Sequence, residues 1–242
     1  MTNPTAYTVH VPYINVHIYK NGSKLGDATA LNLTINTGRN TNLTVRARWD
    51  PTQSGVAAQH IGRDLISQYI SGHNISIVAK THRDSIPRLP AVGTSLSQLK
   101  ITIPVPPPPD LPNNPDPGST HRFLRDATFH VLSSTATFTL ISPLPHDTLW
   151  IETIDAVALY NHSDPIGSIR YADAPFPATP GISRTPKLPV HWSLDAIGRE
   201  RLRQALGGEL SLDARANVTV RLYRFEEDVW YHGRGIGTAI RP

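Results

Sequence analysis

Two segments of the chain share one order of apolar and polar positions. Residues 14–19 alternate between apolar and polar side chains, which predicts a half-buried strand, and Trp49 follows after further alternating segments. Residues 149–160 predict a second long, mostly apolar strand. Trp192 follows this strand after nearly the same number of residues as separate Trp49 from the first strand. Self-similarity of this kind indicates two copies of one small domain.

Each copy also contains a segment in which the apolar period changes from two residues to about four. Residues 54–71 predict an amphipathic helix closed by Gly72, and residues 193–206 predict a second helix capped by Ser193. Both helices carry an Ile-Gly-Arg-acid sequence, and alternating strand patterns follow both. We therefore expect a mainly β fold, in which each domain is a β-sandwich with one long helix.

A proline-rich segment separates the two copies. Residues 104–118 read PVPPPPDLPNNPDPG, and proline at this density removes backbone donors and fixes φ, which excludes helix and sheet interior. The segment predicts a stiff linker, with a proline-rich ligand for aromatic-lined grooves as the alternative. The expected organisation is a first domain over 1–103, a linker over 104–120 and a second domain over 121–242. The opening strands of the first domain are expected to lie outside the chain.

Composition and charge indicate which class of molecule the protein is suited to bind. The 242 residues carry a formal net charge of +4, but arginine and lysine are scattered and mostly alternate with apolar residues. This distribution is typical of a solvated surface and does not favour nucleic-acid binding. Val, Ile, Thr and Pro are frequent, which fits β-rich domains with many turns.

The sequons favour a secretory lumen, although the chain contains no cysteine. Six of the twelve asparagines stand in Asn-x-Ser/Thr without proline. The expected glycosylation candidates are Asn21, Asn32, Asn42, Asn74, Asn161 and Asn217. On the predicted strands, Asn32, Asn42 and Asn217 point away from the apolar face. The alternative is that Asn and Thr simply suit strand surfaces and turns.

Neither a membrane-spanning apolar stretch nor an opening signal peptide is visible in the sequence. A lumenal protein needs one of the two. We therefore expect the chain to be a fragment whose membrane attachment lies in a segment outside it.

No segment carries a recognisable catalytic or metal-binding pattern. Residues 233–237 (GRGIG) resemble a phosphate-binding glycine loop, but no helix can follow them, which favours a glycine-rich strand or bulge. The eleven histidines include no His-x-x-x-His pair, and no Gly-x-Ser-x-Gly elbow is present. The acidic residues 226–228 predict a hairpin turn with solvated charges. We expect no cofactor, no metal and no enzymatic activity, and a hydrolase ranks third among the functions considered.

Longer motifs carry a family resemblance. They are YKNGSKLGDATALNLTINTGRNTNLTV at 19–45 and, in the second half, ALYNHSDPIG, LPVHWSL, ALGGELSLDARANVTVRL and VWYHGRGIG. Together they resemble a fungal family of unknown function built from tandem late-embryogenesis-abundant type 2 domains. The resemblance implies fibronectin- or immunoglobulin-like sandwiches in the lumenal part of a single-pass membrane protein. One member with a similar C-terminal block is a yeast vacuolar membrane protein implicated in termination of autophagy, so the implied location is the vacuole or another secretory-pathway lumen.

Two functions of different classes fit these features. The leading expectation is a non-enzymatic lumenal scaffold or protein-interaction module of a fungal vacuolar or endomembrane protein. The alternative is a module that binds or transfers a lipid or another hydrophobic ligand, because a helix across a sandwich edge can open an apolar cavity. The expected lining residues are Trp49, Ile61, Leu65, Ile66, Trp192, Ile197 and Leu202, for which core packing is the competing role. The expected partner is accordingly an unknown protein or a lipid.

Overall fold

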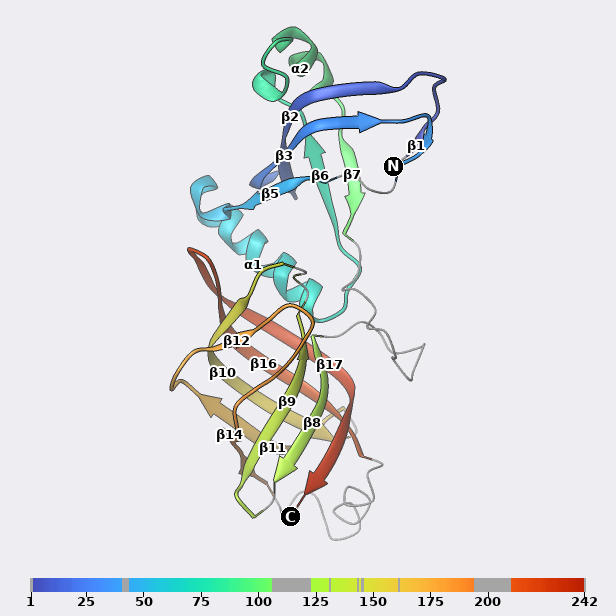
Figure 1. Cartoon of the computed structure of the whole chain (residues 1–242). Helices are drawn as coiled ribbons and strands as arrows, with labels where there is room; N and C mark the ends of the chain where they lie inside the picture. Colours follow the sequence, from blue (N-terminus) through green and yellow to red (C-terminus); the bar gives the residue numbers. More distant parts are fainter. Residues whose placement is uncertain are drawn as a thin grey trace. The chain divides into compact units, whose positions relative to one another are not determined.

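The computed structural model describes residues 2–40, 44–105, 123–130, 132–142, 144, 146–160, 162–193 and 210–241. The chain forms two compact units, both rich in β-strands (Figure 1). The first unit comprises Met1–Gly62 and Ile75–Val105, and the second comprises Arg63–Asn74 and Pro106–Pro242. Helix α1 (Val56–Ile70) therefore begins in one unit and ends in the other. The predicted mainly β fold is confirmed.

The first unit is built on a five-stranded antiparallel sheet in the order β5-β3-β2-β6-β7. Its strands are β2 (Val9–Lys20), β3 (Ser23–Ile35), β5 (Arg46–Trp49), β6 (Ser76–Lys80) and β7 (Ile101–Pro104). A separate pair consists of β1 (Thr2–Asn3) and β4 (Gly38–Arg39). Three short helices went unpredicted, namely η1 (Pro51–Ser54), η2 (Arg83–Ser85) and α2 (Pro90–Leu96).

Two sharp reversals follow directly from local sequence. Asn21 and Gly22 have φ of 49° and 85°, and two positive φ values in a row are the backbone of a two-residue type I′ turn. Gly72, with φ of 80°, ends α1 in a Schellman motif, in which the His73 N–H donates to the Gln68 carbonyl at 2.9 Å. The predicted turn and helix end are confirmed.

The second unit contains a ten-stranded sheet with the main order β13-β9-β8-β17-β16-β10-β11-β15. Its strands are β8 (Leu124–His130), β9 (Thr135–Ile141), β10 (Leu149–Tyr160), β11 (Asp164–Tyr171), β12 (Phe176–Ala178), β13 (Ile182–Arg184), β14 (Leu188–Pro189), β15 (His191–Trp192), β16 (Leu210–Leu222) and β17 (Phe225–Arg241). The partial order β15-β11-β10-β16-β17 repeats the order β5-β3-β2-β6-β7 of the first unit. The internal repeat seen in the sequence is therefore also a repeat of strand order.

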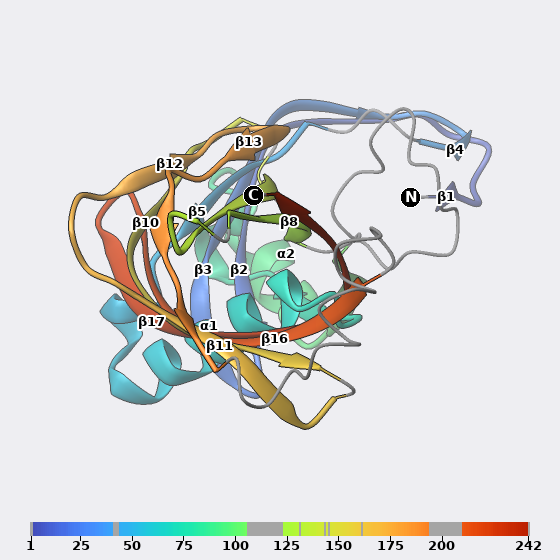
Figure 2. The same ribbon diagram turned by 90° about the horizontal axis from the view of Figure 1, so that it is seen from below.

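The stretch from β12 to β15 closes the second sheet on itself. β12 pairs with β10, β13 and β14 pair with β9, and β15 pairs with β11. One stretch of chain thus joins strands from both ends of the sheet, and Figure 2 shows these strands running around the interior of the unit. Along β16, Leu212 and Val220 are buried while Arg215 and Asn217 are exposed, as a two-residue period requires. The enclosed interior is consequently apolar.

The last turns of α1 cover an edge of β17 within the second unit. The Trp230 N–H donates to the Ser67 hydroxyl and the His232 N–H donates to the Ser71 hydroxyl, both at 3.0 Å. Residues four apart on a helix are separated by about 6 Å, and residues two apart on a strand by roughly 6.7 Å, so the two spacings match. The two serine hydroxyls thus accept the hydrogen bonds that the carbonyl oxygens of a neighbouring strand would otherwise accept.

The predicted helix at 193–206 lies outside the described residues after Ser193, as does the proline-rich segment beyond Val105. The prediction that residues 226–228 form the hairpin turn is wrong, because Leu222 pairs directly with Phe225 and leaves a two-residue turn before them. The acidic residues instead begin β17.

Candidate ligand cavity

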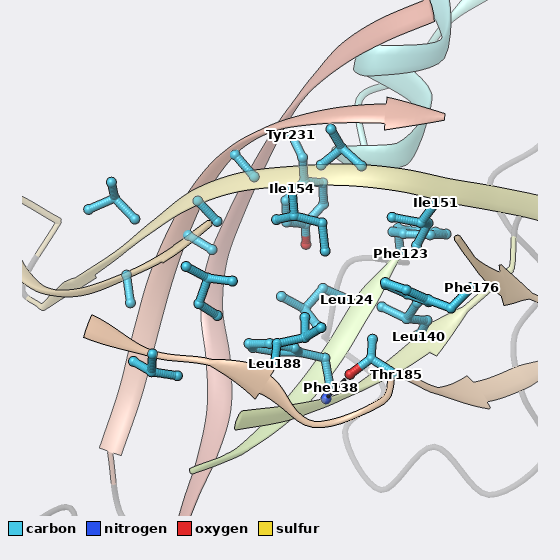
Figure 3. A pocket seen from close by; sticks show the side chains of 18 of the residues that line it. Phe123, Leu124, Phe138, Leu140, Ile151, Ile154, Phe176, Thr185, Leu188 and Tyr231 are labelled. Atoms are coloured by element: carbon cyan, nitrogen blue, oxygen red, sulfur yellow. Dashed lines mark hydrogen bonds between the residues drawn. The ribbon is translucent and has the colours of Figure 1, made fainter. Parts of the chain in front are cut away.

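The second unit encloses a cavity of about 110 Å³ inside its curved sheet. Figure 3 shows Ile154 and Tyr231 on one side of it and Leu188 and Phe138 on the other. The volume is several times the roughly 10–15 Å³ that one water molecule requires on this kind of measure.

A row of glycine and alanine across four neighbouring strands provides this space. Gly167 on β11 pairs with Ala158 on β10, which pairs with Ala214 on β16, which pairs with Gly233 on β17. Residues directly opposite one another on paired strands point to the same face. Gly167, Ala158 and Ala214 all line the cavity. Because these side chains are so short, they leave a gap beside the row. The atoms on the opposite wall of the cavity therefore lack packing partners there.

The neighbouring row repeats the pattern with one large residue. Ala156 pairs with Ala216, and Ala216 pairs with Tyr231. The Tyr231 side chain bends over the position of Gly233, since a Cβ placed on that glycine would lie 2.5 Å from the tyrosine oxygen. Gly233 is therefore required where Tyr231 packs, and the smaller residues beside it keep the cavity open.

Aromatic side chains and the end of α1 form the remaining wall. Phe129 contacts Trp192 edge to face, with ring centres 5.0 Å apart, and contacts Phe138 in the same manner at 6.3 Å. Ile70 of α1 also lines the cavity, and its carbonyl accepts a long hydrogen bond from the Phe123 N–H at 3.4 Å.

The cavity offers almost no polar chemistry. No charged side chain lines it among the described residues. The Thr185 hydroxyl accepts from the Phe138 N–H at 3.0 Å and donates to the Pro186 carbonyl at 2.9 Å, so it is already engaged. Within the part of the chain that the structure describes, the buried Trp192 Nε1–H has no hydrogen-bond partner. Such a lining can hold an apolar molecule by hydrophobic contact and dispersion.

Of the residues predicted to line a cavity, one lines it and the others lie elsewhere or outside the described residues. Trp192 lines it, and Ile66 packs against the surrounding core. Leu65 is buried and Ile61 half-buried on α1, and neither is among the lining residues. Trp49 belongs to the first unit, where its ring lies beside Gly62. Ile197 and Leu202 lie outside the described residues.

The alanines of the small-residue rows were missed by the sequence analysis, although a signal was present. The matching strands contain DAVALY and DARANV, each with two alanines spaced by two residues. Alanine is depleted in strands because it fills little of a sheet surface. Two such pairs in strands expected to be neighbours therefore point to a deliberate gap in the core.

Four sequon asparagines have described side chains, and all four are exposed: Asn21, Asn32, Asn74 and Asn217. Asn21 and Asn32 also have positive φ, at 49° and 50°. Asn42 and Asn161 lie outside the described residues. At the four described positions a glycan would extend into solvent.

The glycine segment 233–237 lies within β17 and next to a bulge, as predicted. The pairing register shifts between Leu212 and Ala214, and the Gly235 N–H donates to the intervening Asp213 carboxylate at 2.9 Å. Burial raises the pKa of Asp213, but hydrogen bonds from His162 and Gly235 and the charge of Arg234 outweigh it and lower the pKa overall. The segment is thus part of the sheet, where it pairs with β16 and, from Gly237 onward, also with β8.

Histidine also forms one compact cluster in the first unit. The rings of His17 and His82 stack with centres 4.0 Å apart, and His82 Nε2 lies 2.8 Å from the Asn15 side-chain oxygen. His82 Nδ1 accepts from the Asp84 N–H at 3.3 Å, which caps η2. No group of three or more histidine, aspartate or glutamate side chains suited to a metal ion occurs in the part of the chain that the structure describes.

Family models match both halves of the chain. The model of the Tag1-like fourth LEA-2 like domain matches residues 1–94, and the model of the Tag1-like fifth LEA-2 like domain matches residues 116–230. The chain carries two Tag1-like LEA-2-like domains in tandem. A comparison with curated proteins finds no significant match. Among the described residues, no helix of these domains is long and apolar enough to cross a membrane.

Proposed function

We propose that the second LEA-2-like domain binds a small apolar group, such as the end of a lipid acyl chain or a similarly small hydrophobic ligand. The observation that carries this proposal is the cavity of about 110 Å³, whose described lining includes no charged side chain. Two rows of glycine and alanine keep it open. This is the site from which a non-enzymatic binding function would follow.

The energetics favour an occupant. An unfilled cavity destabilises a fold, by about 24 cal/mol per Å³ in core-truncation series, because the atoms that line it lack packing partners. An apolar ligand restores the missing contacts and removes its own surface from water, at about 25 cal/mol per Å². Binding and folding therefore stabilise one another.

Native mass spectrometry after incubation with phosphatidylcholine vesicles tests the proposal. The protein is expected to retain a lipid-sized adduct that the Ala216→Leu variant loses, because leucine at 216 fills the space from inside. The variant should also gain about 1–2 kcal/mol in free energy of unfolding, since roughly two or three carbon atoms become buried.

A matched control comes from the other face of the same strand. Arg215 is exposed on β16, so Arg215→Leu adds apolar surface without entering the cavity and should retain the adduct. Retention of lipid by Ala216→Leu, or its absence from the unsubstituted protein, would remove the cavity as the binding site.

The second candidate is a lumenal, glycosylated scaffold or interaction module of a fungal vacuolar or endomembrane protein. The exposure of Asn21, Asn32, Asn74 and Asn217 supports it, because sequons must reach solvent to carry glycans. Endoglycosidase treatment of protein from its native host should lower its mass by several glycans. An unchanged mass together with cytosolic recovery would contradict the lumenal placement.

A further inference from the structure

The cavity of the second domain has a polar group in its wall that no protein acceptor satisfies. Among the described lining residues, the side chains with a polar atom are those of Thr185, Trp192 and Tyr231. The Thr185 hydroxyl already accepts from one backbone N–H and donates to one backbone carbonyl. The indole N–H of Trp192 is buried, and no acceptor from the described part of the chain reaches it.

Packing holds the Trp192 indole on the cavity side of the sheet. Trp192 of β15 pairs with Gly167 of β11, and residues directly opposite one another point to the same face. A Cβ placed on Gly167 would lie 3.5 Å from the Cε3 atom of the indole. The Phe129 ring meets the indole edge to face, with ring centres 5.0 Å apart, and an aromatic face is at most a weak acceptor. The indole is therefore positioned by packing, while its N–H lacks a strong acceptor.

A bound molecule with an acceptor atom suits this N–H better than water does. A buried donor without an acceptor loses its hydration and gains nothing in return, so native structures usually pair such groups with water or a ligand. A buried water molecule needs about two to four polar partners, and the indole N–H supplies one. The remaining wall is apolar, which favours a molecule that is itself mostly apolar.

The size and charge of the cavity limit the rest of the molecule. A cavity of about 150 Å³ in another protein holds benzene. The cavity of about 110 Å³ in this domain is somewhat smaller, so it suits a molecule or chain end of roughly five carbon and oxygen atoms. Because no charged side chain lines it among the described residues, the occupant should be uncharged.

We propose that the preferred occupant is a small uncharged carbonyl compound, a ketone or an ester, whose oxygen accepts a hydrogen bond from the Trp192 indole N–H. This inference rests on the proposed binding function and narrows it. A plain alkyl chain end would fill the same space but leave the N–H unpaired, and a site built to hydrogen-bond its ligand discriminates against analogues that lack the polar atom. Trp192 is thus the residue that determines ligand specificity.

Two ligands of one shape test the proposal by nuclear magnetic resonance on the whole chain. One is methyl propyl ketone, and the other is the alkene in which a methylene group replaces the carbonyl oxygen. Both should shift the amide signals of the lining residues Ala156 and Ala216. The ketone alone should move the Trp192 indole N–H signal downfield, because a hydrogen bond to oxygen deshields the proton.

A substitution at Trp192 measures the contribution of the N–H to specificity. Trp192→Phe keeps an aromatic ring and removes the donor, so the ratio of ketone affinity to alkene affinity should fall about fivefold. The matched control is Trp150→Phe, which removes an indole N–H from β10 at a residue that does not line the cavity. The control should leave the ratio unchanged.

The outcomes separate this inference from the proposed function. Binding of both ligands with an unchanged ratio in Trp192→Phe would overturn the carbonyl preference and leave the binding function standing. Failure of both ligands to shift any lining signal would overturn both. A ratio that falls in Tyr231→Phe but not in Trp192→Phe would assign recognition to the tyrosine hydroxyl and also contradict the proposal. The downfield shift is measured in the unsubstituted chain, so it decides the proposal even where a variant does not fold.

Discussion

At the scale of single residues, Gly233 and Tyr231 depend on each other. A methyl group at 233 would lie 2.5 Å from the tyrosine oxygen and 2.9 Å from two of its ring carbons, and Tyr231 is buried. We expect Gly233→Ala to lower the free energy of unfolding by about 1–3 kcal/mol, because the buried ring must leave its rotamer. Urea denaturation measures the change.

The control for that substitution lies four residues further along the same strand. A Cβ on Gly237 would meet nothing within 4 Å, so Gly237→Ala should change stability by no more than about 0.5 kcal/mol. Equal effects of the two substitutions would show that the packing of Tyr231 does not decide the identity of residue 233.

His17 should make stability depend on pH. Burial lowers its pKa below 6.5, the stacked His82 and Lys24 lower it further, and Asp27 at 3.4 Å opposes them. The folded chain therefore binds a proton at His17 less readily than the unfolded chain. The contribution of His17 to the free energy of unfolding is fully present above about pH 6.5. It declines as the pH falls below that value, until His17 is protonated in the folded state as well.

Urea midpoints at pH 7.5 and pH 5 measure this dependence. His17→Gln should make the decline shallower, whereas His10→Gln, an exposed position on the same strand, should leave it unchanged. A steeper decline in the His17 variant would contradict the assigned direction.

At the scale of elements, the contact between α1 and β17 depends on serine side chains that accept hydrogen bonds from the strand. Ser67 is fully buried, and its hydroxyl is the acceptor for the Trp230 N–H. Ser67→Ala should leave that N–H buried without a partner and lower the free energy of unfolding by about 1–3 kcal/mol. Ser71→Ala should cost less, because the corresponding bond to His232 is exposed and water can replace it.

Hydrogen exchange locates the effect. The amide of Trp230 should lose protection in Ser67→Ala, and that of His232 in Ser71→Ala, while amides in β2 of the first unit stay unchanged. Unaltered protection at Trp230 would mean that another group satisfies this edge.

At the scale of the whole molecule, the second compact unit is not one continuous stretch of chain. It includes Arg63–Asn74, which brings Ser67, Ser71 and the cavity-lining Ile70. A fragment of residues 121–242 should therefore be less stable than the second unit in the whole chain, by roughly 3 kcal/mol or more. Urea denaturation of the fragment and of the whole chain, monitored by tryptophan fluorescence, measures the difference.

A peptide of residues 56–74 provides the complementary measurement. Added in excess, it should raise the unfolding midpoint of the fragment, whereas the same peptide with Ser67 and Ile70 replaced by aspartate should not. A fragment as stable as the unit in the whole chain would show that Arg63–Asn74 contributes nothing.

The sequence by itself determined the features that depend on residues close together in the chain. Asn21-Gly22 specifies a turn with two positive φ values, Gly72 ends α1, and the long, mostly apolar run over 149–160 predicts β10 with the bounds that the structure shows. The repeated patterns predict two copies of one small domain. Local backbone preference and a two-residue period are sufficient for these features.

Only the tertiary structure decided what the second domain encloses and what covers it. Gly167, Ala158, Ala214 and Gly233 come from four strands, and the pairing register alone aligns them into one row. Ser67 and Trp230 are 163 residues apart in the chain, so no local pattern links them. A cavity and a covered strand edge are both properties of long-range register, which a single sequence encodes but does not display.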